Sequence, residues 1–78
     1  MARARMEILV EPFRENEPGP HVEAVLDVFR ARGLVFDLGP FATSVEGELD
    51  DLLEAVGALL AAGFAEGADS IQTRVELA

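Results

Sequence analysis

The sequence predicts an α+β fold in which a four-stranded antiparallel sheet carries two helices on one face. Three observations lead to it: four segments alternate as strands do, two have helical periodicity, and their order along the chain is βαββαβ. Two right-handed β-α-β crossovers joined by a hairpin produce this two-layer sandwich, the split βαβ arrangement. We expect residues 1–78 to form a single domain.

The first half of the chain predicts one strand and one helix. Residues 6–13 alternate between apolar and mixed side chains, which is the period of a half-buried strand. Pro20 stands where a helix tolerates proline, at its first position, and Gly33 is placed to end the same helix. The apolar side chains at helical spacing are Val22, Val25, Leu26 and Phe29.

The second half predicts a hairpin, a longer helix and a final strand. Residues 34–38 and 42–46 form the hairpin strands around the break at Gly39-Pro40, and residues 71–77 form the last strand. Gly67 ends the second helix. The apolar face expected for that helix consists of Leu49, Leu52, Leu53, Val56, Leu60, Gly63 and Phe64.

One face of the sheet is left uncovered by the helices, and we expect function there. Alternation places the following residues on it: Leu9, Glu11, Phe13, Val35, Asp37, Ser44, Glu46, Gln72, Arg74 and Glu76. This mixture is too apolar to be simply solvated and too charged to be core. Because Leu9, Phe13 and Val35 would form an exposed apolar patch, we expect a homodimer or homotetramer.

Composition excludes several classes of partner. Fifteen acidic residues against six arginines give a net charge of -9, which would repel a nucleic-acid backbone and an anionic membrane surface alike. The chain has no cysteine, so it has no disulfide framework and no thiolate nucleophile. No apolar run approaches the roughly 20 residues that span a bilayer, and we expect a cytoplasmic protein.

Catalytic and metal-binding groups are sparse. The only histidine, His21, stands at the start of the first helix, where a surface role is the commoner reading. The acidic run at residues 46–51 lacks the alternate spacing of a calcium loop and suits a helix N-terminus instead. We expect no catalysis, no metal and no cofactor.

The segment from Gly33 to Glu48, with the core Pro40-Phe41-Ala42-Thr43-Ser44-Val45-Glu46-Gly47-Glu48, resembles the small thiamine-binding family. Members of that family have a ferredoxin-like fold and bind thiamine or its hydroxymethylpyrimidine half. The resemblance runs from Val10-Glu11-Pro12 to the end of the chain, including residues 66–69 and Thr73. Departures from the family pattern occur at Arg14, Ala42 and Leu60.

The resemblance implies a non-catalytic thiamine or hydroxymethylpyrimidine binder with a carrier, sensor or salvage role. Such a site needs an apolar slot, hydrogen-bonding groups for the aminopyrimidine and a carboxylate near the cation. The implied ligand-binding residues are Glu11, Phe13, Asp37, Phe41, Thr43, Ser44 and Glu46. In this reading Glu46 and Thr43 bind the aminopyrimidine, Glu11 or Asp37 faces the cation, and Phe13 or Phe41 packs on a ring.

Two alternatives stay open. Glu46 and Arg74 can form a cross-strand ion pair, with Thr43 present only as a β-former. The chain can also be a structural or regulatory homo-oligomer that binds no vitamin. If it binds thiamine, the diphosphate form should be disfavoured, because the chain has neither a glycine-rich phosphate cradle nor a lysine.

Overall fold

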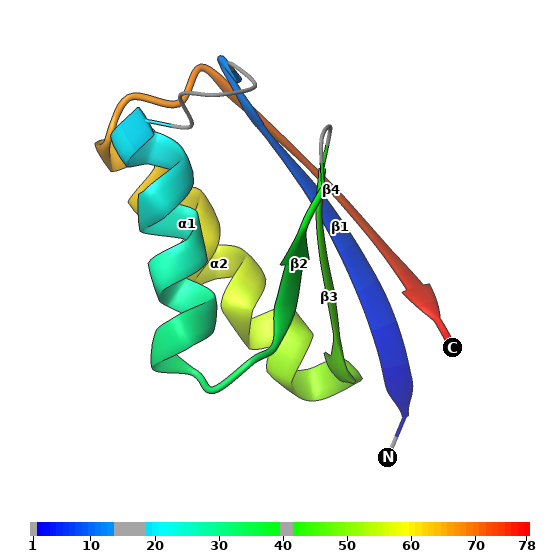
Figure 1. Cartoon of the computed structure of the whole chain (residues 1–78). Coiled ribbons are helices and arrows are strands. Elements are labelled where there is room, and N and C mark those ends of the chain that lie inside the picture. The colour runs from blue at the N-terminus through cyan, green and yellow to red at the C-terminus, as the bar shows by residue number, and fades with distance from the viewer. Residues whose placement is uncertain (1, 14–18, 40–41) are drawn as a thin grey trace.

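The computed structural model describes residues 2–13, 19–39 and 42–78 and shows the predicted order of elements (Figure 1). The elements are β1 Arg3–Glu11, α1 Gly19–Ala31, β2 Phe36–Leu38, β3 Thr43–Glu48, α2 Leu49–Ala65 and β4 Ser70–Leu77. The sheet order is β2-β3-β1-β4 with antiparallel neighbours, and both helices lie on one face. The prediction of a ferredoxin-like α+β sandwich is therefore confirmed.

Several strand boundaries differ from those predicted. β1 begins at Arg3, since Arg3 and Arg5 lie opposite Glu48 and Glu46 of β3 and are thereby accommodated on the uncovered face. β1 ends at Glu11, two residues before Phe13. β2 has only three residues, so that Val35 lies before it, in the connection from α1.

The core lies between the sheet and the two helices. Alternate residues of the central strand β1 point into it and are almost fully buried: Ala4, Met6, Ile8 and Val10. The predicted apolar face of α1 is confirmed, with Val22, Val25, Leu26 and Phe29 all buried. Burial of each large apolar side chain contributes about 1.5–3 kcal/mol, so this layer dominates the stability.

The end of α1 is fixed by Gly33 and by Phe36. Gly33 adopts a φ of 68°, and the N–H groups of Gly33 and Leu34 donate to the carbonyls of Arg30 and Phe29, as in a Schellman motif. The guanidinium of Arg30 then lies 5.4 Å from the centre of the Phe36 ring. Hydrogen bonds to Asp27 and Glu23 raise the pKa of Arg30. These contacts tie the short strand β2 to α1.

The core face of α2 is rotated from the one predicted. Its buried residues are Leu52, Ala55, Leu59 and Gly63, whereas Leu53 and Phe64 are 54% and 48% exposed. The prediction was wrong for these two because α2 is apolar on two adjacent stripes, and spacing alone does not say which one meets the sheet. The close approach of Val25 and Ile71 to Gly63 selects the stripe that contains this glycine.

Gly63 and Gly57 of α2 give a matched test of this packing. A methyl group added at Gly63 would lie 2.7 Å from Ile71 Cδ1 and 3.1 Å from Val25 Cγ2, whereas one added at Gly57 meets nothing within 4 Å. Both alanine variants gain about 0.5–1 kcal/mol of helix propensity. We expect Gly63→Ala to be about 1–3 kcal/mol less stable than Gly57→Ala in chemical denaturation, because the Ile71 side chain must change position and Val25 of α1 must give way. Equal stabilities would contradict this packing.

Candidate functional site

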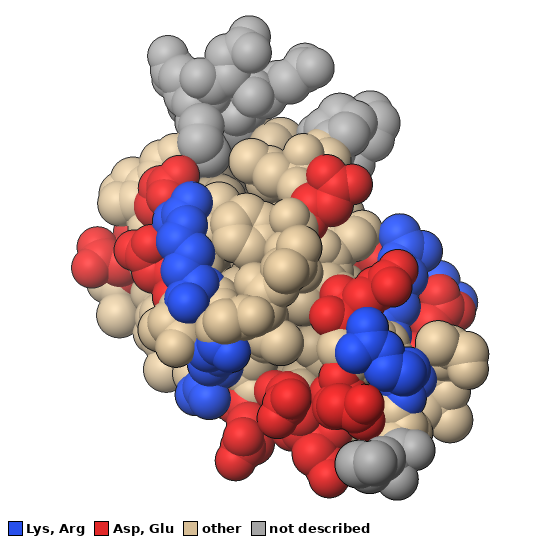
Figure 2. Space-filling view, turned by 60° about the horizontal axis from the view of Figure 1, so that its bottom comes forward, with Lys and Arg blue, Asp and Glu red and all other residues tan. Residues whose placement is uncertain are grey.

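The uncovered sheet face is a network of charged side chains. Arg5 donates to Ser44 Oγ at 3.1 Å and lies 3.7 Å from a carboxylate oxygen of Glu7. Arg74 lies 4.0 Å from Glu7 and 3.2 Å from Glu76. Figure 2 shows a different side, the end of the molecule where β1 and α2 begin; acidic side chains gather there beside arginines. On the uncovered sheet face, Glu7 and Glu76 are thus paired with arginines in a chain whose net charge is -9.

The alternative in which Glu46 and Arg74 form a cross-strand ion pair is wrong. Strand β1 lies between β3 and β4, so residues of β3 and β4 are not neighbours. Glu46 lies opposite Arg5, while Arg74 lies opposite Glu7.

The expected apolar patch on this face is also wrong. Phe13 comes after the end of β1, so the strand alternation does not reach it, and its half-buried ring packs against the core. Val35 is 83% exposed but precedes β2. Leu9 remains on the uncovered face, half-buried and opposite Gln72.

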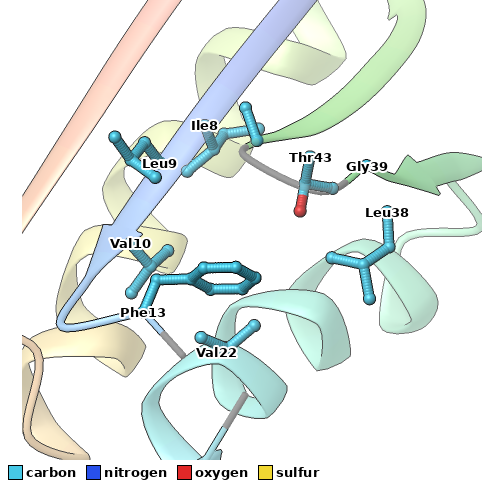
Figure 3. A pocket seen from close by; sticks show the side chains of 9 residues that line it. Ile8, Leu9, Val10, Phe13, Val22, Leu38, Gly39 and Thr43 are labelled. Atoms are coloured by element: carbon cyan, nitrogen blue, oxygen red, sulfur yellow. The ribbon is translucent and has the colours of Figure 1, made fainter. Parts of the chain in front are cut away.

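An apolar pocket opens at the end of the sheet where the pairing of β1 with β3 stops, at Ile8 and Thr43 (Figure 3). The ring of Phe13 points from beside Val22 into the space between Leu38 and Thr43. The pocket has about 230 Å³ of empty space, part of it continuous with solvent. Its described lining residues are Ile8, Leu9, Val10, Phe13, Val22, Leu38, Gly39, Ala42 and Thr43.

Thr43 is the described lining residue that carries a polar side chain. It is 6% exposed, and its hydroxyl group is drawn inside the ring of apolar groups. Apolar walls with a few fixed polar groups are typical of small-molecule sites. The cavity itself is small, about 10 Å³ or room for about one water, so a heteroaromatic ring would enter only if Phe13 or Leu38 moved.

A second hollow lies on the uncovered face and shares Ile8, Leu9 and Ala42 with the apolar pocket. Glu7, Gln72 and Arg74 form its polar side, and it has about 450 Å³ of empty space, much of it open to solvent. The two hollows therefore adjoin at the same end of the β1–β3 pairing, one on each side of the sheet.

The seven residues predicted as ligand contacts do not converge. Thr43 and Phe13 come together in the apolar pocket, and Glu11 is the last residue of β1. On the other face are Asp37, Ser44 and Glu46, with Asp37 opposite Ser44. Phe41 lies outside the described residues.

The structure does not bring Thr43 and Glu46, the two residues predicted to bind one aminopyrimidine ring, together on one face. Side chains of β3 alternate between faces, and Thr43 is buried on the helix side while Glu46 is exposed on the other. Their separation by three positions puts them on opposite sides of the sheet.

The sequence reading missed Val22 and Leu38 as pocket residues. Val22 was assigned only to the core stripe of α1, and Leu38 only to a strand, because helical spacing and alternation do not record which core residues also border a pocket. His21, next to Val22, has its Nε2 within hydrogen-bond distance of the Pro12 carbonyl oxygen. This contact gives His21 a structural role at the start of α1.

Two searches of the described residues were negative. No group of three or more histidine or acidic side chains there is arranged to hold a metal ion. None of the described helices is long and apolar enough to cross a membrane.

The chain is similar to several known proteins. Over 56 residues it is 34% identical to a UPF0045 protein of Clostridium perfringens, a match that spans 72% of this chain and 59% of that protein. It resembles the structure of a domain of unknown function, DUF77, from Bacillus cereus, with 26% identity and a TM-score of 0.72 over 99% of this chain and 75% of the other.

A third similarity concerns the fold alone. A protein of Thermotoga maritima assigned provisionally to thiamine biosynthesis or salvage superposes with a TM-score of 0.68 at 17% identity, covering 96% of this chain and 81% of that one.

Residues 6–78 match the family model described as thiamine-binding protein. Because that model covers nearly the whole sequence, the chain belongs to the thiamine-binding protein family.

Proposed function

We propose that this chain is a non-catalytic binding protein for thiamine or its hydroxymethylpyrimidine moiety, with a carrier, sensor or salvage role in the cytoplasm. The family match over residues 6–78 carries the proposal. The provisional assignment of the Thermotoga maritima protein to thiamine metabolism is consistent with it.

Of the two adjoining hollows, the apolar pocket is the better location for the pyrimidine ring. A flat heteroaromatic ring needs apolar walls to displace water and a small number of polar groups to fix its orientation. Phe13 offers a ring for stacking, and the Thr43 hydroxyl group can donate to a ring nitrogen or accept from the exocyclic amine. Glu11, two residues before Phe13, is the carboxylate that we assign to the thiazolium cation.

The uncovered face is the weaker location. Ser44 already accepts a hydrogen bond from Arg5, and Glu46 is exposed opposite the same arginine. Ion pairs in water contribute little and are screened by salt. A ligand there would have to compete with Arg5 for Ser44 and, on an exposed surface, would keep most of its hydration.

Charge and chemistry limit the ligand and the reaction. A diphosphate group would meet a chain with a net charge of -9, so thiamine and the free pyrimidine should bind in preference to thiamine diphosphate. Thr43, Phe13 and Glu11 offer a binding surface without a paired nucleophile and base, which favours a binder over an enzyme. The alternative is a structural or regulatory homo-oligomer that binds no vitamin.

Thr43→Val and Ser44→Ala form a matched pair that tells the two faces apart. Valine keeps the shape of Thr43 but removes its hydroxyl group, so thiamine affinity measured by titration calorimetry should fall by about two- to tenfold. Ser44→Ala and Glu46→Gln, on the other face, should leave the affinity unchanged. Loss of affinity in the Ser44 and Glu46 variants alone would place the ligand on the uncovered face.

Comparison of three ligands tests the identity of the bound group. Calorimetric titrations should show heat with thiamine and with hydroxymethylpyrimidine, and weaker binding of thiamine diphosphate because of charge repulsion. Tightest binding of the diphosphate would contradict the charge argument. No heat with any of the three at millimolar concentration would favour the homo-oligomer without a vitamin.

Absence of turnover is a separate expectation. Purified protein incubated with thiamine or its phosphates should release no product detectable by chromatography. Product formation that disappears in Glu11→Gln or Glu46→Gln would show that the chain is an enzyme.

A further inference from the structure

The backbone that leads from β1 to Phe13 is held at two successive carbonyl groups. β1 ends at Glu11, whose carbonyl oxygen accepts a hydrogen bond from the Asp69 N–H group at 2.7 Å. The next residue, Pro12, has no N–H group to donate, but its carbonyl oxygen can accept. Nε2 of His21, in the first turn of α1, lies within hydrogen-bond distance of that oxygen. The connection after β1 is therefore tied to α1 through Pro12.

The contact between His21 and Pro12 restricts more than one atom. A carbonyl oxygen can only accept, so Nε2 of the imidazole is the donor. The peptide group is planar, and the Pro12 carbonyl shares its plane with the N and Cα atoms of Phe13. A hydrogen bond that fixes the direction of this oxygen therefore also restricts the direction in which the Phe13 side chain leaves the backbone.

The start of α1 leaves room for the imidazole ring of His21. Gly19, the first residue of α1, has a φ of 80°, and a Cβ atom there would lie 3.0 Å from Cε1 and 3.2 Å from Nδ1 of His21. A side chain at position 19 would therefore press on the ring that donates to Pro12. The glycine and the histidine together form one arrangement that is directed at the Pro12 carbonyl.

The position of Phe13 decides how much of the apolar pocket is open. Its ring points into the space between Leu38 and Thr43 (Figure 3), and the cavity that remains has room for about one water. Thr43 is only 6% exposed. A ring-shaped ligand can reach the Thr43 hydroxyl group only when Phe13 or Leu38 turns aside. Phe13 can then stack on the ligand only if its backbone stays in place.

We propose that His21 is a positioning residue of the apolar pocket: its hydrogen bond to Pro12 holds the Phe13 ring beside Thr43 in the free protein and keeps the Phe13 backbone in place when a ring-shaped ligand enters. His21 acts through Phe13 and does not itself touch the ligand. Backbone that is already ordered has less freedom to lose on binding, so the contact favours affinity. The inference rests on the proposed function only in this last step, since the first step concerns the free chain.

Cysteine labelling measures the first step without any ligand, because the chain has no native cysteine. Thr43→Cys puts a thiol of similar size at the pocket. Val45→Cys puts one in the core, two residues further along the same face of β3, where the side chain is 1% exposed. A thiol reagent reaches a buried cysteine only when the structure opens around it, so the labelling rate follows the population of the open state. The first thiol therefore reports opening of the pocket, and the second reports opening of the core.

His21→Leu and His21→Gln are the matched pair. Leucine keeps much of the bulk but removes the N–H donor, whereas the glutamine amide can still donate to the Pro12 carbonyl. Combined with Thr43→Cys, His21→Leu should be labelled about two- to tenfold faster than His21→Gln, the range expected for one lost hydrogen bond. Combined with Val45→Cys, the two variants should be labelled at the same rate. Equal rates at the pocket thiol, or the same increase at both thiols, would overturn the proposal, because His21 would then act only on the fold as a whole.

Titration calorimetry with thiamine tests the second step. His21→Leu should bind thiamine about two- to tenfold more weakly than His21→Gln, because the Phe13 backbone must then be ordered on binding. Equal affinities would overturn the role of His21 in ligand binding. If the labelling rates differ as expected and neither the variants nor the parent chain binds thiamine, the effect of His21 on Phe13 is upheld and the proposed ligand is wrong.

Discussion

The strict alternation of the central strand β1 is the constraint on which the rest of the structure depends. Its even-numbered side chains are buried against both helices, while its odd-numbered side chains, Arg5 and Glu7 among them, face the uncovered side. Because a shift of one residue would exchange the two faces completely, the register of β3 and β4 on β1 is fixed by burial. The apolar core and the charged network are thus two consequences of one pairing.

The candidate site depends on where that pairing ends. Beyond Ile8 and Thr43 the described strands β1 and β3 no longer pair, and α1 begins close by. Phe13 can therefore leave the strand alternation and join Thr43, Val22 and Leu38 around a pocket. A pocket at the end of a sheet combines rigid walls from the core with side chains that can move, which suits capture of a small ring.

Helix α2 carries more apolar surface than one sheet can cover. Gly63 allows Val25 of α1 to approach closely, while Leu53 and Phe64 remain half exposed. This exposed apolar surface lies on the helix side, away from the uncovered face of the sheet. On the uncovered face, Arg5 and Arg74 form ion pairs with Glu7 and Glu76.

The sequence by itself determined the order of elements, the buried face of α1 and the family, because alternation, helical spacing and the segment from Gly33 to Glu48 are local patterns. Alternation also implied that Thr43 and Glu46 lie on opposite faces. Only the tertiary structure decided which stripe of α2 is buried, that β1 separates Glu46 from Arg74, and that Phe13 turns into a pocket. These depend on contacts between distant segments, such as the approach of Val25 and Ile71 to Gly63, which no local pattern records.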